Sequence, residues 1–248
     1  MRFEKWHGLG NDFILLDCRV NDILNKKEFA IKLCDRHFGI GADGLVCILQ
    51  STVADYVMEI FNPDGSEAEM CGNAIRCVAK VLEKSPVTIE TSSGIKECVV
   101  SEDGSVKVNM GSPLGIKKRG RLTTLFMGNP HAVLYVDNFD FDWKKEGEKI
   151  ENNREMFPER TNVEFVKVLN DDTIEVKVWE RGAGATLACG TGACASVVAT
   201  VTDKGIHRDV NVELPGGILH VSWSESGDVY ITGPAEKVFD GDLSLYER

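Results

Sequence analysis

Apolar and polar residues alternate along much of the first half of the chain, the pattern of half-buried β-strands. The alternation predicts strands at residues 2–6, 13–18, 45–50, 56–61, 87–91, 95–100 and 105–110. Residues 26–38 instead carry apolar side chains at helical spacing, and this segment stops at Gly39, a residue type that commonly ends helices. A second helix is expected directly after Cys71, where the sequence reads AIRCVAKVLEK.

The second half of the chain repeats this order of elements. Its pattern predicts strands near residues 132–137, 163–168, 173–179, 210–214, 218–223 and 229–232, and a helix from about 190 to 203. A weakly amphipathic, acidic stretch at 143–155 is the counterpart of the first helix. Residues 111–120, GSPLGIKKRG, are rich in glycine, proline and charge, so they are expected to link the halves.

The repetition extends to single residues. An interval of 118 positions separates three pairs of residues: Cys71 and Cys189, Asn62 and Glu180, and Asn11 and Asn129. Both cysteines begin a Cys-Gly sequence and stand nine residues after the polar residue that ends an alternating run. The chain is therefore interpreted as a duplicated domain with one cysteine of interest in each half.

Each half is predicted to be a mostly antiparallel, barrel-like sheet wrapped around one central helix. The helical segments VAKVL and ASVVATV are nearly continuous in small apolar residues, which indicates burial on most sides. The first domain is expected to span residues 1–115, with the tail 238–248 as a candidate addition, and the second to span 116–237. The predicted fold class is α/β, of the α+β kind, with two pseudosymmetric domains.

Cys71 and Cys189 precede the predicted central helices, where the first backbone N–H groups have no helical partner. Such a position favours anions and is expected to lower the pKa of a thiol. The competing interpretation, an inert buried thiol, suits the six cysteines that lie in apolar runs: Cys18, Cys34, Cys47, Cys77, Cys98 and Cys194. Two equivalent thiols suit a reaction that removes a proton from one face of a carbon and returns one to the other.

Composition narrows the class of protein. The 248 residues are 43% hydrophobic and 27% charged, as in ordinary soluble globular proteins. With 28 basic and 39 acidic residues the net charge is −11, which argues against nucleic acid or an anionic membrane as a partner. Neither a secretory signal nor an apolar stretch of membrane-spanning length is visible, so the eight cysteines are expected to be reduced thiols in the cytoplasm.

Sequence motifs for metals and cofactors are not convincing. The cysteines form no C-x-x-C pair and no histidine cluster accompanies them, which disfavours both a zinc site and a thiol-redox site. The sequence GIGADG at 39–44 matches a dinucleotide-binding glycine pattern, but it follows a helix and precedes a strand, the reverse of the required context. We therefore expect neither a cofactor nor a metal.

Polar residues near the second cysteine are candidates for proton transfer. His131 stands beside Asn129 in GNPH, and Glu180 and Arg181 occupy the position that mirrors Asn62. A surface or capping histidine and a solvated turn are the competing interpretations. Acid and base groups beside a thiol favour the catalytic one.

Seven ordered motifs across essentially the whole chain resemble those of the diaminopimelate epimerases: HGLGNDF, RHFGIGADG, IFNPDGSEAEMCGN, GNPH, FPERTNVEF, ERGAGATLACGTGACA and LPGG. The resemblance implies a cofactor-independent enzyme with two pseudosymmetric domains that close over a small-molecule substrate. It implies interconversion of LL- and meso-2,6-diaminopimelate in lysine and peptidoglycan-precursor biosynthesis. A homodimer is expected.

The resemblance also implies roles for residues. Cys71 would act on the LL isomer and Cys189 on the meso isomer, with His131 and Glu180 at positions that assist the cysteines. The implied substrate-binding residues are Asn11, Asn62, Gly72, Asn73, Asn129, Asn162, Glu180, Arg181, Gly190 and Thr191. Four of these would offer backbone amides to the α-carboxylate: Gly72, Asn73, Gly190 and Thr191. Asn62, Asn162 and Arg181 would hold the distal, non-reacting centre.

Three positions depart from the family pattern. Residue 74 is Ala where Gly is usual, residue 185 is Ala where Glu is common, and residue 44 is Gly where some members have Gln. The chain is also somewhat short for the family, which implies trimmed loops. These departures bear on substrate breadth and leave the two thiols untouched.

Two alternatives stay open from the sequence. A racemase of lysine or proline type on the same scaffold is one, although a proline-like substrate would give Arg181 no distal group to bind. A non-catalytic binding protein of the same fold is the other, and the presence of both cysteines disfavours it.

Overall fold

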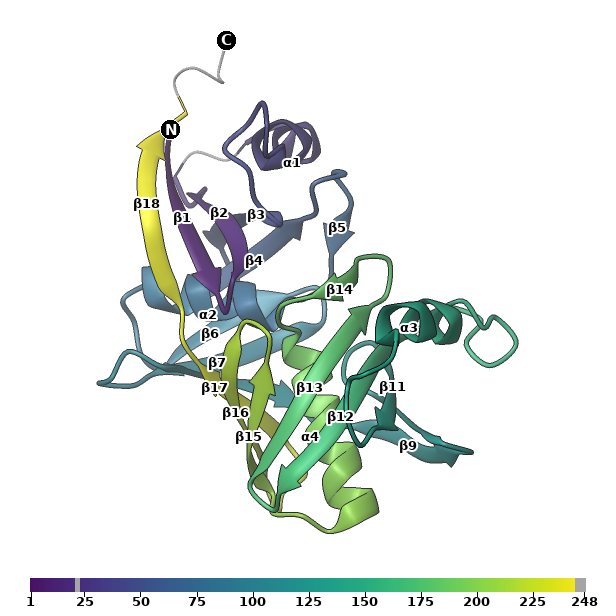
Figure 1. Ribbon diagram of the computed structural model, residues 1–248. Coiled ribbons are helices and arrows are strands. Elements are labelled where there is room, and N and C mark those ends of the chain that lie inside the picture. The colour runs from purple at the N-terminus through teal and green to yellow at the C-terminus, as the bar shows by residue number, and fades with distance from the viewer. Residues whose placement is uncertain (21–22, 244–248) are drawn as a thin grey trace. The chain divides into compact units, whose positions relative to one another are not determined.

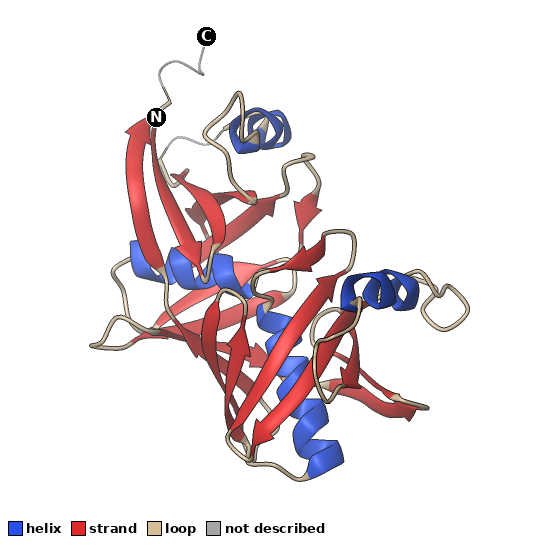
Figure 2. Ribbon diagram, in the orientation of Figure 1, coloured by secondary structure: helices blue, strands red, loops and turns tan. Residues whose placement is uncertain are grey.

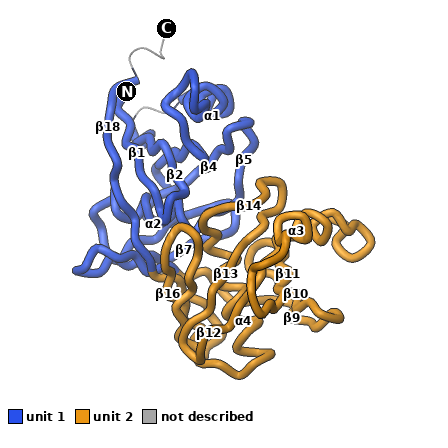
Figure 3. Tube along the Cα trace, in the orientation of Figure 1, with its two compact units in different colours: residues 1–108, 233–248 blue, residues 109–232 orange. Residues whose placement is uncertain are grey.

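The structure is a computed structural model that describes residues 1–20 and 23–243. The chain divides into two compact units, of which unit 1 comprises residues 1–108 and 233–248 and unit 2 comprises residues 109–232 (Figure 3). Both units are built mainly of strands, with two helices described in each (Figure 2). The predicted α/β class, with a mostly antiparallel sheet, is confirmed.

Unit 1 begins with a hairpin and ends with a strand from the C-terminal part of the chain (Figure 1). Its elements are β1 (Arg2–Gly8), β2 (Asn11–Asp17), α1 (Lys26–Cys34), β3 (Gly44–Gln50), β4 (Tyr56–Phe61), β5 (Glu67–Ala68), α2 (Gly72–Val81), β6 (Val87–Thr91), β7 (Gly94–Val100), β8 (Val106–Gly111) and β18 (Glu236–Asp242). The strands pair in the order β18-β1-β2-β3-β4-β6-β7-β8, with β2–β3 and β4–β6 parallel and the other pairs antiparallel.

Unit 2 repeats this arrangement. Its elements are β9 (Leu114–Arg119), β10 (Leu122–Phe126), β11 (Pro130–Tyr135), α3 (Trp143–Glu151), β12 (Asn162–Asn170), β13 (Thr173–Glu180), β14 (Gly184–Thr186), α4 (Gly190–Lys204), β15 (Asp209–Leu214), β16 (Gly217–Trp223) and β17 (Val229–Gly233). The strands pair in the order β9-β10-β11-β12-β13-β15-β16-β17, with β11–β12 and β13–β15 parallel. The duplication inferred from sequence intervals is therefore present in the strand topology.

β1 of unit 1 and β10 of unit 2 hold equivalent positions, and each has an outer antiparallel partner in a segment where the sequence predicts no strand. In unit 2 this partner is β9, so the expectation of a plain linker at 111–120 was wrong: residues 114–119 pair with β10. In unit 1 the partner is β18, which pairs with β1 from Arg2 to His7. Residues 244–248 of the tail 238–248 lie outside the described residues.

The central helix of each unit is buried, as its apolar sequence predicts. In α2 the residues from Gly72 to Ala79 are buried, and the helix contacts β1, β2 and β7. In α4 nearly every residue from Gly190 to Thr200 is buried, and the helix contacts six strands of its own unit. The buried hydroxyls of Ser196 and Thr200 donate to the carbonyls four residues earlier, at 2.8 and 2.6 Å, so they leave no unsatisfied donor.

Helix α1 ends earlier than expected. The predicted helix ran to residue 38, but the structure ends α1 at Cys34 and leaves Phe38 89% exposed. The Asp35 carboxylate accepts hydrogen bonds from the backbone N–H groups of His37 and Phe38, at 2.7 and 2.8 Å. This local Asp turn competes with the helix and ends it before Gly39.

Arg76 fixes the first turn of α2 from within the core of unit 1. Its side chain is fully buried and donates to the carbonyls of Gly72 and Pro234 and to the Asn73 side-chain oxygen, at 3.0, 3.1 and 3.0 Å. β1 passes so close that a Cβ on Gly8 would lie 2.8 Å from the Arg76 guanidinium. Arg76 thereby joins the helix start to the C-terminal segment of the same unit.

Replacing Arg76 with Met should destabilise the protein by about 3 kcal/mol, because three buried acceptors lose a charged donor. Urea unfolding would measure this change, with the exposed Lys27→Met as the control, expected to stay within about 0.5 kcal/mol of wild type. Equal midpoints for Arg76→Met and wild type would mean that these contacts contribute nothing net to stability.

Candidate active site

Cys71 is the N-cap residue of α2, the position expected from the sequence. Its backbone is extended, with φ −139° and ψ 119°, and its carbonyl accepts the Ile75 N–H at 3.0 Å. The thiol is half-buried and lies 3.6 Å from the Asn11 side-chain oxygen. A neutral amide is therefore a direct neighbour of this thiol.

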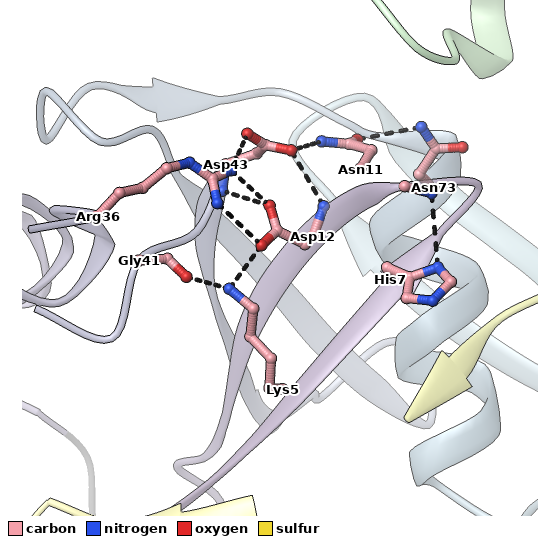
Figure 4. Close-up of polar contacts among 9 residues, drawn as sticks. Lys5, His7, Asn11, Asp12, Arg36, Gly41, Asp43 and Asn73 are labelled. Atoms are coloured by element: carbon pink, nitrogen blue, oxygen red, sulfur yellow. Dashed lines mark hydrogen bonds and ion pairs between the residues drawn. The ribbon is translucent and has the colours of Figure 1, made fainter. Parts of the chain in front are cut away.

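A hydrogen-bonded chain orients the Asn11 amide (Figure 4). The Asn73 amide nitrogen donates to the Asn11 oxygen at 3.0 Å, and the Asn11 nitrogen donates to Asp43 Oδ2 at 2.9 Å. The same Asp43 oxygen accepts the Asp12 N–H at 3.1 Å. Three implied site residues of unit 1, Asn11, Cys71 and Asn73, are thus brought together.

Behind Asn11 lies a cluster of charged side chains that the sequence argument did not identify (Figure 4). The buried Lys5 ammonium lies 2.7 Å from Asp12 Oδ2, and the Arg36 guanidinium lies 2.8 Å from Asp12 Oδ1 and 2.7 Å from Asp43 Oδ1. Burial raises the pKa of the Asp12 carboxyl, but hydrogen bonds from Arg36, Lys5 and Asp43 outweigh it and hold the pKa well below its usual range. Asp12 is therefore a fixed anion, suited to holding the loop and unsuited to exchanging protons.

Asn62 lies just after β4, in a turn of its own. Its side-chain nitrogen donates to Ser66 Oγ at 2.9 Å, and its N–H donates to the Ser66 carbonyl at 2.8 Å. Among the described residues, no hydrogen bond joins Asn62 to the group around Cys71. Its orientation is set by the turn.

The three departures from the family pattern lie in different settings. A Cβ on Gly44 would meet the Phe61 carbonyl at 3.2 Å and the Phe13 ring at 3.4 Å, so the position is already filled. Ala74 is fully buried in the first turn of α2. Ala185 is an exposed residue of β14, opposite Trp179 of β13.

Cys189 is the N-cap residue of α4 and is more deeply buried than Cys71, with 6% of the residue exposed. Its sulfur accepts the Gly192 N–H at 3.3 Å and lies 3.5 Å from the Thr191 hydroxyl. Gly190, directly after it, is buried. The first turn of α4 thus directs a backbone amide at the sulfur itself.

Burial, followed by two acidic groups, nevertheless dominates the electrostatics of Cys189. Burial raises the pKa of the thiol well above its usual range, and the Glu180 and Glu164 carboxylates raise it further. The Thr191 hydroxyl and the Gly192 N–H lower it, but by less. The expectation that the helix start lowers this pKa was wrong, because burial and two neighbouring acids outweigh the hydrogen bonds that the first turn of the helix offers to the sulfur.

Glu180 ends β13 beside this thiol. The Thr186 hydroxyl donates to Glu180 Oε1 at 2.5 Å, and a further hydrogen bond joins the Glu180 carboxyl to Cys189. Burial raises the pKa of the Glu180 carboxyl, and these two hydrogen bonds only partly offset it. A carboxyl and a thiol, each biased toward its neutral form, are therefore in direct contact.

His131 is a buried residue of β11, so the surface interpretation is wrong. Its Nδ1 lies 2.7 Å from Glu164 Oε1, and its Nε2 lies 2.7 Å from the Asn129 side-chain oxygen. Both the His131 and the Glu164 side chains are 0% exposed. Glu164 is a functional candidate that the sequence argument missed, and its only signal was a lone acid in the otherwise apolar start of β12.

Asn162 and Arg181 are held together. The Asn162 side chain donates to the Pro130 carbonyl at 3.0 Å and accepts the Arg181 N–H at 2.9 Å. The Arg181 guanidinium reaches the Glu159 carbonyl at 3.4 Å, and the residue is exposed. The guanidinium therefore has donors left for a ligand.

Residues 1–20 and 23–243 contain neither a metal-binding cluster nor a helix that could span a membrane. No group of three or more His, Cys, Asp or Glu side chains is arranged to hold a metal ion. None of the helices in that part of the chain is long and apolar enough to cross a membrane.

Comparison with known proteins identifies the family. The sequence profile of the diaminopimelate epimerases matches residues 3–115 and 123–238. The chain belongs to the diaminopimelate epimerase family. The resemblance drawn from the seven motifs is thereby confirmed.

Relatives named diaminopimelate epimerase align with the chain over nearly its whole length. The protein of Acetivibrio thermocellus is 47% identical over 100% of both chains, and that of Pelotomaculum thermopropionicum is 48% identical over 98% of both. The protein of Methanococcus maripaludis is 46% identical over 99% of this chain and 100% of its own. Membership of the diaminopimelate epimerase family thus rests on full-length similarity.

Solved structures with low sequence identity share the fold. A probable proline racemase from Agrobacterium radiobacter has a TM-score of 0.74 at 16% identity, covering 98% of this chain and 93% of its own. A phenazine biosynthesis protein of the PhzF family from Bacillus anthracis has a TM-score of 0.71 at 18% identity, covering 97% and 98%. At these identities the likeness establishes the fold alone.

The environment of Cys189 predicts how its reactivity should change. Glu180→Gln removes a negative charge that raises the thiol pKa, so the pKa should fall and alkylation at a fixed alkaline pH should become several-fold faster. Iodoacetamide labelling as a function of pH, followed by mass spectrometry of the Cys189 peptide, would measure this. The exposed Glu155→Gln is the control and should label like wild type. Unchanged or slower labelling of Glu180→Gln would contradict the electrostatic assignment.

Proposed function

We propose that this member of the diaminopimelate epimerase family interconverts LL- and meso-2,6-diaminopimelate with two thiols, Cys71 and Cys189, as its proton carriers. The observation that carries the proposal is the thiol at the N-cap of the buried central helix in each unit. Because the two cysteines hold equivalent positions in duplicated units, each can serve one face of the reacting carbon. One thiolate removes the α-proton, and the other thiol delivers a proton.

The carbanion formed at Cα needs stabilisation without a cofactor. The first N–H groups of a helix carry partial positive charge, so they are suited to the α-carboxylate on which negative charge accumulates. We assign this role to the backbone amides of Gly72 and Asn73 in α2 and of Gly190 and Thr191 in α4. We assign Asn11, whose side-chain oxygen lies 3.6 Å from the Cys71 sulfur, and its counterpart Asn129 as side-chain contacts for the same reacting end of the substrate.

The two thiols have unequal assistants. Following the family pattern, Cys71 acts on the LL isomer and Cys189 on the meso isomer, with His131 and Glu180 assisting. Glu180 interacts with Cys189, and its raised pKa suits a group that holds and passes a proton. The neutral Cys189 thiol is suited to the acid role until a base removes its proton.

The distal end of the substrate is assigned to Asn62, Asn162 and Arg181. The exposed Arg181 guanidinium can bind a carboxylate through two parallel hydrogen bonds, and its backbone N–H is already fixed by Asn162. Binding energy from this remote group can be used to orient the reacting centre. We further propose a cytoplasmic homodimer that serves lysine and peptidoglycan-precursor biosynthesis and requires no cofactor.

The direct test is deuterium incorporation at Cα in D₂O without any added cofactor. LL-diaminopimelate should exchange and epimerise, whereas lysine and proline should exchange far more slowly. Cys71→Ala and Cys189→Ala should each abolish epimerisation while leaving the far-UV circular dichroism unchanged, because each removes one of two required proton carriers. Near-wild-type epimerisation by either variant would exclude the two-thiol mechanism, and proline as the preferred substrate would indicate a proline-type racemase instead.

Arg181 should decide specificity for the distal carboxylate. Arg181→Lys keeps the charge but cannot donate two parallel hydrogen bonds to one carboxylate. The fall in kcat/KM for diaminopimelate should therefore correspond to a loss of about 2–4 kcal/mol of transition-state stabilisation. Any slow exchange of lysine, which lacks the distal carboxylate, should change little. Arg208→Lys, at an exposed arginine elsewhere in unit 2, is the matched control. Equal losses on both substrates would place Arg181 at the reacting end of the substrate or in a structural role.

A further inference from the structure

Glu164 is a buried acid for which unit 1 has no counterpart. The parallel pair β11–β12 repeats the register of β2–β3, so His131 opposite Asn162 corresponds to Phe13 opposite Gly44. Two residues further along each strand, Glu164 opposite Val133 corresponds to Val46 opposite Leu15. Phe13 and Val46 of unit 1 are thus replaced in unit 2 by His131 and Glu164.

The contacts of these two groups form a line that ends at Asn129. Glu164 Oε1 lies 2.7 Å from His131 Nδ1, and His131 Nε2 lies 2.7 Å from Asn129 Oδ1. Within the described residues the second carboxyl oxygen of Glu164 has no hydrogen-bond partner. A buried carboxyl group with one oxygen lacking a hydrogen-bond partner destabilises the fold. The contact with His131 is therefore the reason we assign for an acid at position 164.

The contact with Asn129 defines the donor side of the imidazole. The Asn129 side chain turns its oxygen toward His131 Nε2, and because an amide oxygen can only accept, Nε2 is the donor of this contact. Nδ1 is then the ring nitrogen that faces Glu164 Oε1.

From this arrangement we infer that Glu164 is a positioning residue: through His131 it fixes the Asn129 amide with its NH₂ group free for the substrate carboxylate. In the described part of the chain, the Asn129 NH₂ group makes no hydrogen bond of its own. Asn11, the equivalent residue in unit 1, is oriented by Asp43 instead, which accepts from its NH₂ group. The inference rests on the proposed function, in which Asn129 contacts substrate.

The same carboxyl group also lies next to the Cys189 thiol. A Cβ on Gly192 would be 3.0 Å from Glu164 Oε1 and 3.3 Å from Cys189 Sγ, so both atoms border one small volume at the start of α4. The titratable groups that influence one another here are His131, Glu164, Glu180 and Cys189. An apolar residue at 164 would leave His131 Nδ1 without a partner at the centre of this group.

Glu164→Met tests the positioning role, with Glu164→Gln as the conservative variant. Met matches the size of Glu but cannot hold Nδ1, so kcat for diaminopimelate should fall by on the order of tenfold or more. Gln can donate to Nδ1 in one of its two orientations, so it should recover part of that loss. Thr200→Val, which removes a buried hydroxyl elsewhere in unit 2, should keep the wild-type kcat.

Histidine ¹⁵N chemical shifts give a readout independent of activity. In the wild-type protein the His131 Nε2 signal should be that of a protonated nitrogen, and in Glu164→Met both neutral tautomers should be populated. An unprotonated Nε2 in the wild type, a Glu164→Met variant with wild-type kcat, or Glu164→Gln no better than Glu164→Met would each overturn the inference. If Glu164→Met fails to fold, the wild-type and Gln spectra still decide it. Absence of epimerisation by the wild type would instead refute the proposed function.

Discussion

The first turn of a buried helix carries backbone N–H groups that no helical carbonyl can reach, and both units of this chain depend on how those groups are satisfied. In α2 a cysteine is the N-cap residue, and the fully buried Arg76 donates to the Gly72 carbonyl in the same turn. In α4 the Cys189 sulfur itself accepts a backbone N–H. Because these helices are enclosed by apolar strands, their first turns are the polar ends of otherwise apolar cores, and reactive groups are placed there.

The duplicated framework carries different polar chemistry in each unit. Around Asn11, unit 1 places a cluster of fixed charges in which Asp12 is an anion held by Lys5 and Arg36. Around Asn129, unit 2 instead places the buried pair His131 and Glu164. The two stereoisomers that an epimerase interconverts carry the α-proton on opposite faces of the reacting carbon, so the groups on the two faces meet different molecules. Equivalent thiols in unequal surroundings suit that requirement better than two identical halves would.

The parts of the fold with one buried face could be predicted from the sequence, and the fully exposed parts could not. Strands such as Tyr56–Phe61 show alternation because every second side chain enters a core. β9 and β18 are exposed along nearly their whole length, so no alternation marks them, and glycine and charge in the first suggested a linker. Glu164 was overlooked for the opposite reason, since a single acid in an apolar strand carries no periodic signal. The pKa of Cys189 was misjudged because the sequence reveals the helix start but not the acids that fold against it.

The outer strand β18 has a consequence for synthesis of the chain. Unit 2 is formed by one continuous stretch, residues 109–232, whereas unit 1 needs Glu236–Asp242 beside β1. On a ribosome, the sheet that contains β1 therefore stays incomplete until residues 236–242 have emerged, and unit 2 can finish folding before it. During that interval the edge of β1 presents unpaired backbone groups, the kind of surface on which nascent chains aggregate or recruit chaperones.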